Sequence, residues 1–432
     1  MLYYYNTSGL TSGTASIMKK KRTFRYALYL MVAIALQGCV EETGFVPLFN
    51  GRDLSGWVNV NGAPGTWTVR DDMIVCSGLP TGVLRTTEHY ENFILELEWR
   101  HLHPGGNAGL FVYSDALPVR GQPFTRAVEC QVMDGNHGDV FAIQGATMTP
   151  DRPHPQGWMR CLPSEERARP TGQWNHYRVE SREGRLTLAV NGKVVSGGSQ
   201  SVPRKGYIVL ESEGSEVHFR NIRMKTLPSS DPPPAEVATV DEGFVSLYNG
   251  VDLTGWQVEP RHVEHWAAQD WILDYDGQPT PRDRHLWSEK AYGDFVLIVD
   301  WRFTPQAETL QAPDAGESGI FLRGRAESRI TIWNRPMGSG GLLEQGDAEP
   351  ISPELRARLT PKVRADRAPG QWNRFVITLA GNQLSVVLND QTVIDQARVP
   401  QLPLRGPIAL VDQGAPIQFA NLYIKKLSQN SE

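Results

Sequence analysis

Cysteine is scarce in this chain of 432 residues, which contains four. Cys76, Cys130 and Cys161 all lie in the first half of the sequence, so at most one intramolecular disulfide can form among them. A framework of disulfides is therefore excluded as the basis of the fold. A zinc site built from CxxC pairs or from closely spaced Cys and His residues is excluded as well, because the sequence contains no such motif.

The chain also lacks a strong excess of one charge and lacks long apolar runs. Its formal net charge is -5, and no basic tract follows the N-terminal region, which argues against nucleic acid as a partner. One short apolar run occurs at 26–36. It is too short for a membrane span, which takes roughly 20 apolar residues.

This apolar run forms part of an N-terminal targeting segment. Basic residues at 19–25 precede it, and the sequence LQGC ends it at Cys39. The order is typical of a bacterial lipoprotein signal over residues 1–39, with Met18 as a second candidate start, and it predicts a lipid anchor on Cys39. The alternative is an ordinary secretory signal or membrane anchor. Since Val40 rather than aspartate follows the cysteine, we expect a Gram-negative cell-envelope lipoprotein, in the outer membrane or periplasm.

The remainder of the chain is a tandem duplication. GFVPLFNGRDLSGW at 44–57 returns as GFVSLYNGVDLTGW at 243–256, and GQWN occurs at 172–175 and again at 370–373. The period of about 200 residues is far longer than the repeat of a solenoid or a propeller. Each copy is therefore expected to be a whole domain with its own core.

The positions of the repeats predict where the domains begin and end. We expect a first domain over 40–228 and a second over 243–428. The stretch 229–242 between them begins with a proline-rich run that cannot continue a sheet, and it is predicted to be a linker.

Both copies have the pattern of an all-β protein. Short segments rich in β-branched and aromatic residues alternate with Gly, Asn and Pro turns. In the first copy they predict strands at 94–99, 110–113, 128–133, 176–181, 186–190 and 207–210. Asn191-Gly192 predicts a hairpin turn, because both positions of that turn need positive φ. We expect two tandem β-sandwiches of the jelly-roll type.

Several motifs follow one another in a fixed order in the first copy: LFNGRDLSGW, YENFILELEWR, NAGLF from Asn107, ECQVMD from Glu129, GQWN and VNGK. This order resembles the 3-keto-disaccharide hydrolase domain family over nearly all of residues 44–228. The resemblance implies a concanavalin-like, laminin-G-like jelly roll that acts on 3-keto sugars. The second copy keeps the same framework motifs.

The two copies differ in one polar cluster. Four polar residues of the first copy, Asn107, Glu129, Gln131 and Asp134, align with Glu317, Arg329, Thr331 and Asn334 of the second. The stretch GNHGD at 135–139 has no counterpart in the second copy. Because the side-chain period of a strand is two, Glu129 and Gln131 point to the same face. We therefore predict an active first domain and a non-catalytic second domain.

The reaction that the resemblance implies needs a base, a proton donor and a group that stabilises an enolate. The ketone at C3 acidifies the C2 proton, so a base can remove it, the anomeric oxygen can leave, and water can add. Glu129 or His137 is predicted to be the base. Asp134 or Asp139 would donate a proton or, with His137, bind a divalent metal ion such as calcium or zinc. Arg100 or that metal ion would hold the enolate oxygen.

The predicted substrate-binding residues are Glu98, Arg100, Asn107, Gln131 and Trp158. Structural roles compete with several of these assignments. Arg100 and Glu98 recur in the second copy as arginine and aspartate, which suits structural ion pairs equally well. Trp158 would be either a sugar-stacking platform or a loop anchor.

His137 and Asp139 have a structural alternative as well, since such residues are common in turns. Two alternatives also exist for the function as a whole. One is a conventional glycosidase that uses two carboxylates, Glu129 with Asp134 or with Glu98. The other is a non-catalytic, carbohydrate-binding surface lipoprotein, because a fold of this kind does not fix function.

Overall fold

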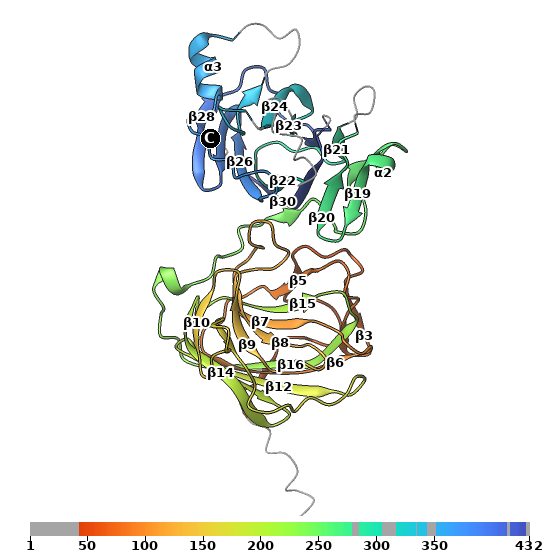
Figure 1. Cartoon of the computed structure of the whole chain (residues 1–432), viewed down its shortest axis with the longest axis vertical. Coiled ribbons are helices and arrows are strands. Elements are labelled where there is room, and N and C mark those ends of the chain that lie inside the picture. The colour runs from red at the N-terminus through yellow and green to blue at the C-terminus, as the bar shows by residue number, and fades with distance from the viewer. Residues whose placement is uncertain are drawn as a thin grey trace, which may run out of the picture. The chain divides into compact units, whose positions relative to one another are not determined.

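The computed structural model describes residues 43–278, 285–304, 317–333, 335–343, 351–412 and 415–428. The predicted signal, including Cys39, lies outside the described residues, and so does Asn334. The described chain forms two β-sandwiches in tandem, which confirms the predicted all-β fold. Figure 1 shows the two layers of the first sandwich, with β5, β7, β8, β9 and β15 in one layer and β6, β12, β14 and β16 in the other.

The first sandwich packs a nine-stranded sheet against a seven-stranded sheet. The nine-stranded sheet has the order β10-β14-β13-β12-β6-β16-β4-β3, with β1 beside β16. Its strands are β1 (Val46–Pro47), β3 (Trp67–Arg70), β4 (Met73–Cys76), β6 (Phe93–His101), β10 (Thr147–Pro150), β12 (Asn175–Arg182), β13 (Arg185–Val190), β14 (Lys193–Val202) and β16 (Val217–Thr226).

The seven-stranded sheet has the order β11-β9-β8-β7-β15-β5-β2. Its strands are β2 (Trp57–Asn59), β5 (Gly82–Thr86), β7 (Gly109–Ser114), β8 (Ala127–Gln131), β9 (Val140–Ile143), β11 (Arg160–Cys161) and β15 (Tyr207–Ser212). All six strands predicted in the first copy are present, with ends displaced by a few residues at most. The predicted Asn191-Gly192 turn joins β13 to β14, with φ of 47° and 85°.

The second sandwich repeats this arrangement with an eight-stranded and a six-stranded sheet. The larger sheet contains β17 (Val245–Ser246), β19 (Trp266–Gln269), β20 (Ile272–Tyr275), β22 (Phe295–Phe303), β26 (Asn373–Ala380), β27 (Gln383–Leu388), β28 (Gln391–Arg398) and β30 (Ile417–Lys426). The smaller sheet contains β18 (Trp256–Gln257), β21 (Leu286–Ser288), β23 (Glu317–Leu322), β24 (Arg325–Trp333), β25 (Leu342–Leu343) and β29 (Ala409–Leu410).

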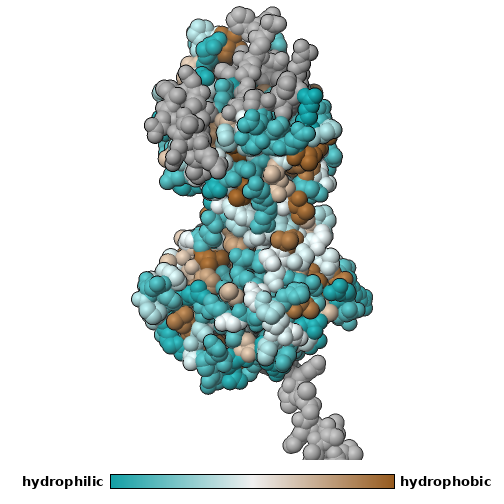
Figure 2. Space-filling view, turned by 45° about the vertical axis from the view of Figure 1, so that its right-hand side comes forward, coloured by the Kyte–Doolittle hydropathy of each residue, from teal (hydrophilic) through white to brown (hydrophobic). Residues whose placement is uncertain are grey.

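Helix is confined to three short pieces of the described chain, η1 (Pro234–Glu236), α2 (His262–His265) and α3 (Pro353–Leu359). None of the described helices has the length and apolar character that a membrane span requires. The face of the molecule in Figure 2 is mainly hydrophilic, with hydrophobic side chains in small groups.

The core of the first sandwich lies between its two sheets. Alternate residues of β6, Phe93, Leu95, Leu97 and Trp99, point into it and are buried. Three unbonded cysteine thiols, Cys76, Cys130 and Cys161, are buried in the same core. The thiols pack there as small apolar groups.

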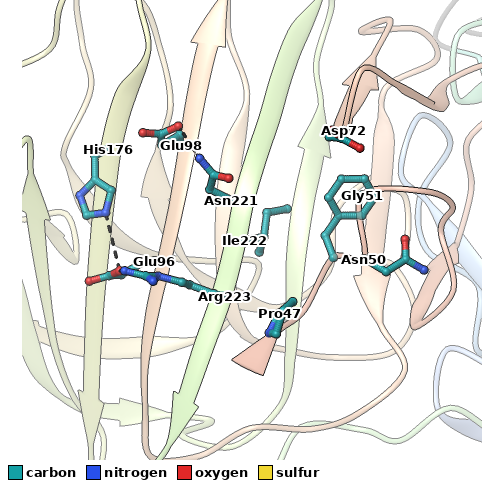
Figure 3. Close-up of a pocket in the computed structure, with 11 residues that line it drawn as sticks. Pro47, Asn50, Gly51, Asp72, Glu96, Glu98, His176, Asn221, Ile222 and Arg223 are labelled. Atoms are coloured by element: carbon teal, nitrogen blue, oxygen red, sulfur yellow. Dashed lines mark hydrogen bonds and ion pairs between the residues drawn. The ribbon is translucent and has the colours of Figure 1, made fainter. Parts of the chain in front are cut away.

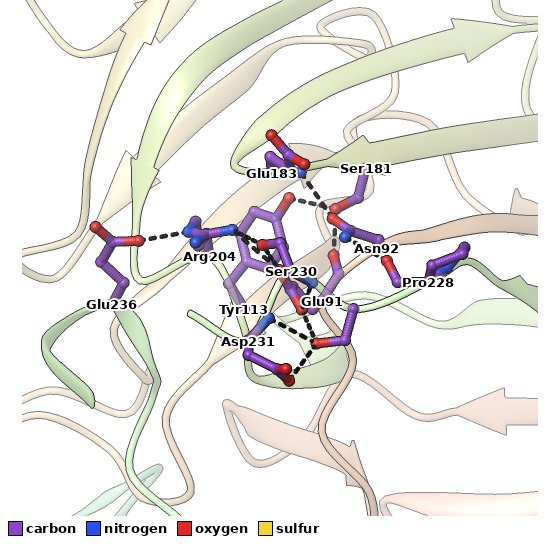
Figure 4. Close-up of polar contacts among 11 residues, drawn as sticks. Glu91, Asn92, Tyr113, Ser181, Glu183, Arg204, Pro228, Ser230, Asp231 and Glu236 are labelled. Carbon is purple, nitrogen blue, oxygen red and sulfur yellow. Dashed lines mark hydrogen bonds and ion pairs between the residues drawn. The ribbon is translucent and has the colours of Figure 1, made fainter. Parts of the chain in front are cut away.

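The proline-rich linker is attached to the first sandwich rather than free. The carboxylate of Glu91 accepts hydrogen bonds from the hydroxyls of Ser229 and Ser230 and from Arg204, at 2.9 Å for Arg204 (Figure 4). Arg204 also pairs with Glu236 of η1. Because Glu91 is buried, these donors compensate for the cost of removing its charge from water.

Candidate active site

Polar residues gather on the outer face of the seven-stranded sheet, the side that points away from the core. On β8, Val128 and Cys130 point into the core, so Glu129 and Gln131 point outward. On β15, Leu210 points inward and Glu211 outward. The strand alternation expected from the sequence therefore brings carboxylates from two different strands to one face.

The pairing of the strands fixes which side chains are neighbours on this face. Glu129 on β8 lies between Phe111 on β7 and Phe141 on β9, and Phe141 in turn lies beside Arg160 on β11. Gly109 on β7 is paired with Gln131. The register between β7 and β15 places Glu211 on the other side of Gly109.

Gly109 leaves the space that two of these carboxylates occupy. A Cβ atom on this residue would lie 2.7 Å from Oε2 of Glu211 and 2.9 Å from Oε1 of Glu129. The carboxylates of Glu129 and Glu211 thus converge above a backbone position that has no side chain. Both residues are buried, at 6% and 2% exposure.

Burial raises the pKa of both carboxyl groups. For Glu129 the pKa rises to about 8, because burial and the nearby Glu213 carboxylate outweigh the opposing effect of Arg160. The pKa of Glu211 rises well above its ordinary range, through burial and the charge of Glu129. Two carboxyl groups this close cannot readily ionise together, so the pair retains at least one proton near neutral pH.

Asn107 and Glu213 border this pair. The amide Nδ2 of Asn107 donates a hydrogen bond to Oε2 of Glu213. The amide oxygen of Asn107 is buried and has no hydrogen-bond partner among the described residues, and the same is true of Oε2 of Glu211. Buried polar atoms without partners are costly to a fold and mark a place where a ligand would supply them.

A cation lies on the other side of Glu129. Arg160 pairs with Asp139, which is buried, and its guanidinium lies 4.7 Å from the ring centre of Phe141. Burial raises the pKa of Asp139, while its bond to Arg160 opposes that shift. Asp139 thus holds Arg160 in line with Phe141 and Glu129 across the sheet.

The structure places His137 in the loop between β8 and β9, as predicted, with a local hydrogen-bonding role. Its Nε2 accepts a backbone hydrogen bond from Ala168 at 2.7 Å, so the proton of the neutral ring lies on Nδ1. Burial lowers the pKa of His137, which keeps the ring neutral. Since the basic nitrogen is already engaged, His137 is a poor base and holds the loop between β8 and β9.

Asp134 and Trp158 have other partners than the carboxylate pair. Oδ2 of Asp134 accepts hydrogen bonds from the backbone of Gly105 and from the hydroxyl of Thr171, both at 3.0 Å, and so ties two loops together. Trp158 is 55% exposed and stacks on His154 with 4.4 Å between ring centres.

Two predicted residues, Glu98 and Arg100, lie on the other sheet. Both project from the outer face of the nine-stranded sheet, because Leu97 and Trp99 between them point into the core. Glu98 accepts hydrogen bonds from Arg220 and Asn221. Arg100 lies 4.5 Å from the ring centre of Trp174. They therefore do not converge with Glu129, contrary to the prediction of one shared site.

The predicted metal ligands are occupied in other ways. Asp134, Asp139 and His137 bind a loop, an arginine and a backbone amide, respectively. Within the described part of the chain, no group of three or more His, Cys, Asp or Glu side chains is arranged to hold a metal ion.

Comparison with known proteins now identifies the family. The model of the 3-keto-alpha-glucoside-1,2-lyase-like domain matches residues 44–225 and again 243–425, which is most of the chain. The chain belongs to this lyase-like family, with two copies of its domain in tandem.

Individual relatives are more distant. A 3-keto-disaccharide hydrolase of Bacteroides thetaiotaomicron is 24% identical over 245 residues, which are 45% of this chain and 82% of the relative. A solved structure from Parabacteroides distasonis, assigned as a glycosyl hydrolase, is 22% identical with a TM-score of 0.35 and covers 44% of this chain and 98% of its own. A carbohydrate-binding module of Bacillus subtilis is 15% identical with a TM-score of 0.31, at 40% and 96% coverage.

The second lyase-like domain has a different set of side chains on the same face. Arg329 occupies the register position of Glu129, opposite Phe321, and Val411 occupies that of Glu211, opposite Gly319. Arg329 is fully buried and pairs with Glu317, which replaces Asn107. A neutralised ion pair therefore takes the place of the carboxylate pair.

Sequence reasoning missed Glu211, Glu213 and Arg160. The first two were detectable by the same comparison of copies that singled out Glu129, since ESEG at 211–214 aligns with VDQG at 411–414. Arg160 had no such signal, because counting back from the shared GQWN motif aligns it with another arginine, Arg358. Its position depends on the pairing of β11 with β9.

Proposed function

We propose that the first lyase-like domain cleaves 3-keto glycosides, with Glu129 as the base and Glu211 as the proton donor. The observation that carries the proposal is the convergence of these two buried carboxyl groups above Gly109. Glu129 is the easier of the two to ionise, because the charge of Arg160 lowers its pKa relative to an isolated buried acid. Glu211 is deeper and keeps its proton.

The proposed reaction begins at C2 of the oxidised sugar. The Glu129 carboxylate removes the C2 proton, and the electrons of the broken C–H bond form an enolate with the C3 oxygen. The guanidinium of Arg160, beside Phe141 on the same face of the sheet, would stabilise the enolate. The bond from C1 to the glycosidic oxygen then breaks as Glu211 donates its proton to the leaving oxygen.

Water completes the net hydrolysis by adding across the new C1–C2 double bond. The proton held by Glu129 returns to C2, and Glu211 recovers its proton from the attacking water. This sequence restores both groups to their starting states. It differs from a conventional glycosidase because it needs the ketone, and only the ketone makes the C2 proton acidic enough to remove.

The test compares oxidised and unoxidised substrates. The protein would be incubated with 3-keto-trehalose and 3-keto-lactose beside trehalose and lactose, and the released sugar followed by mass spectrometry. We expect release from the keto forms alone, and its loss in Glu129→Gln and in Glu211→Gln. Equal release from the parent disaccharides would support the conventional two-carboxylate mechanism instead. Loss of activity with a chelator would indicate that a divalent ion, rather than Arg160, stabilises the enolate.

A further inference from the structure

A pocket of about 560 Å³ opens on the outer face of the nine-stranded sheet of the first sandwich (Figure 3). This is the opposite side of the sandwich from Glu129 and Glu211, so the pocket is separate from the proposed active site. Its volume lies within the range of small-molecule sites, roughly 300–1,000 Å³. Glu98, whose predicted place was beside Glu129, is one of the residues that line it.

One side of the pocket is a row of polar side chains held in place by one another. Glu96 accepts hydrogen bonds from Arg178 and from Arg223, the latter at 2.9 Å. Next to it, Oε2 of Glu98 accepts from Arg220 at 2.6 Å and from Asn221 at 2.9 Å. Oε1 of Glu98 keeps its acceptor capacity. These groups are oriented before any ligand arrives, which lowers the entropy cost of binding.

The charges around this pocket balance. Three carboxylates, Asp72, Glu96 and Glu98, are matched by the guanidinium groups of Arg178, Arg223 and Arg220. A small ion would find little net charge to attract it. A neutral ligand with many hydroxyl groups would instead find charged acceptors and donors alternating along the row, and hydrogen bonds to charged groups are the stronger kind.

The other part of the pocket is apolar. Phe49 and Ile222 are buried beneath it, and Pro47 lies at its edge. Figure 3 shows Ile222 between Pro47 and the row that contains Glu96 and His176. A pyranose ring has the same division, with hydroxyls around its rim and C–H bonds on its faces. We propose that this pocket is a second, non-catalytic site that binds a mono- or disaccharide.

The second sandwich keeps one part of this row, as Asp300 paired with Arg374, and has lost the part around Glu96. At the paired positions of Glu96, Arg178 and Arg223 it has Ile298, Val376 and Tyr423. Arg178 and Arg223 both bond Glu96, and the corresponding uncharged residues Val376 and Tyr423 are both strand partners of Ile298. Exchanging all three together therefore removes the charges without leaving any of them unpaired.

Binding can be tested with turnover at the proposed active site removed. Trehalose, lactose and glucose would be titrated into the Glu129→Gln/Glu211→Gln protein and followed by saturation-transfer-difference NMR. We expect binding of at least one of these sugars. Adding the exchange Glu96→Ile, Arg178→Val and Arg223→Tyr should weaken it at least ten-fold. Arg182→Val, on the same strand β12 but exposed beyond the pocket, is the matched control and should have no effect.

Two results would overturn the proposal. One is that none of these sugars binds the protein in which Glu129 and Glu211 are replaced. The other is that binding survives both the triple exchange and His176→Ala, a milder variant that serves if the triple exchange does not fold. Turnover of 3-keto-trehalose by proteins carrying only the pocket substitutions should be unchanged, so failure of this site and failure of the proposed activity are distinguishable.

Discussion

Where the first sandwich has Glu129 beside Glu211, the second has Arg329 beside Val411, while the strands around both positions pair in the same way. Other features do not change between the copies. Arg100 lies over Trp174, and Arg302 over Trp372, each at 4.5 Å from the ring centre. The comparison separates residues that maintain the sandwich from residues that one copy alone uses for chemistry.

The difference also has an energetic side. The first sandwich keeps two buried carboxyl groups close together with raised pKa values, an arrangement that lowers stability as the pH rises. The second replaces it with a buried arginine that is paired with Glu317. Perturbed carboxyl groups of this kind are typical of functional sites, because a catalytic base and acid need pKa values near the working pH.

The largest effect is expected from Glu129→Gln. Removal of a general base typically costs roughly 10²–10⁴-fold in rate, so kcat for release from 3-keto-trehalose should fall within that range. The matched variant of the second sandwich, Arg329→Gln, should leave kcat unchanged. If both variants reduced kcat equally, the assignment of chemistry to the first sandwich would be wrong.

A smaller loss is expected when the gap above the sheet is filled. Gly109→Ala places a methyl group within 2.9 Å of Oε1 of Glu129 and within 2.7 Å of Oε2 of Glu211, so both carboxylates must move. We expect kcat/KM to fall at least ten-fold in steady-state assays. Gly319→Ala meets Cγ of Arg329 at 2.7 Å and should lower Tm without changing kcat/KM. Full activity of Gly109→Ala would contradict the proposed geometry.

The raised pKa of Glu129 predicts how stability depends on pH. Its pKa in the folded protein is about 8, above the ordinary value of 4.5. The protonated carboxyl group therefore makes its full contribution to the free energy of unfolding below about pH 4.5, and this contribution is lost as the pH rises through 8. Glu129→Gln cannot ionise and should gain in Tm over the unsubstituted protein as the pH rises from 5 to 9, by on the order of 5 °C. Thermal unfolding at a series of pH values measures this, and a constant difference would refute it.

The smallest effect is expected from removing the arginine–tryptophan contact that both sandwiches have. Arg100→Ala and Arg302→Ala each remove a cation from a tryptophan face, an interaction of about 0.5–1 kcal/mol. Denaturant titrations should therefore show two similar small decreases in the free energy of unfolding. Neither variant should change kcat, and a selective loss of activity in Arg100→Ala would return that residue to the active site.

Local pattern was enough to predict the fold. Alternation along 94–99 and 128–133 identifies strands with one buried face, and the duplicated motifs identify two domains. Alternation also predicts that Glu129 and Gln131 share a face. It does not say which strands become neighbours, and so Glu98 and Arg100 were grouped with Glu129 although they lie on the other sheet. That assignment depends on β6 pairing with β12 and β16, whose partners are distant in sequence.

Sequence patterns also cannot predict which hydrogen-bond partner a side chain finds. His137 has the side chain of a base, but the backbone amide of Ala168 occupies its acceptor nitrogen. Comparison of the copies could have found Glu211, but not its contact with Glu129. Glu211 comes from a strand about 80 residues later than Glu129, and only the pairing of β15 with β7 brings the two carboxylates together.

Cys130 lies between Glu129 and Gln131 on β8, with its thiol in the core and its neighbours' side chains on the outer face. A thiol reagent can reach it only when the two sheets separate or β8 detaches. The rate of Cys130 labelling therefore reports how often the strand that carries Glu129 opens in the native protein. Substitution of the other two buried cysteines would make that signal specific, and a bound sugar on the outer face would slow it.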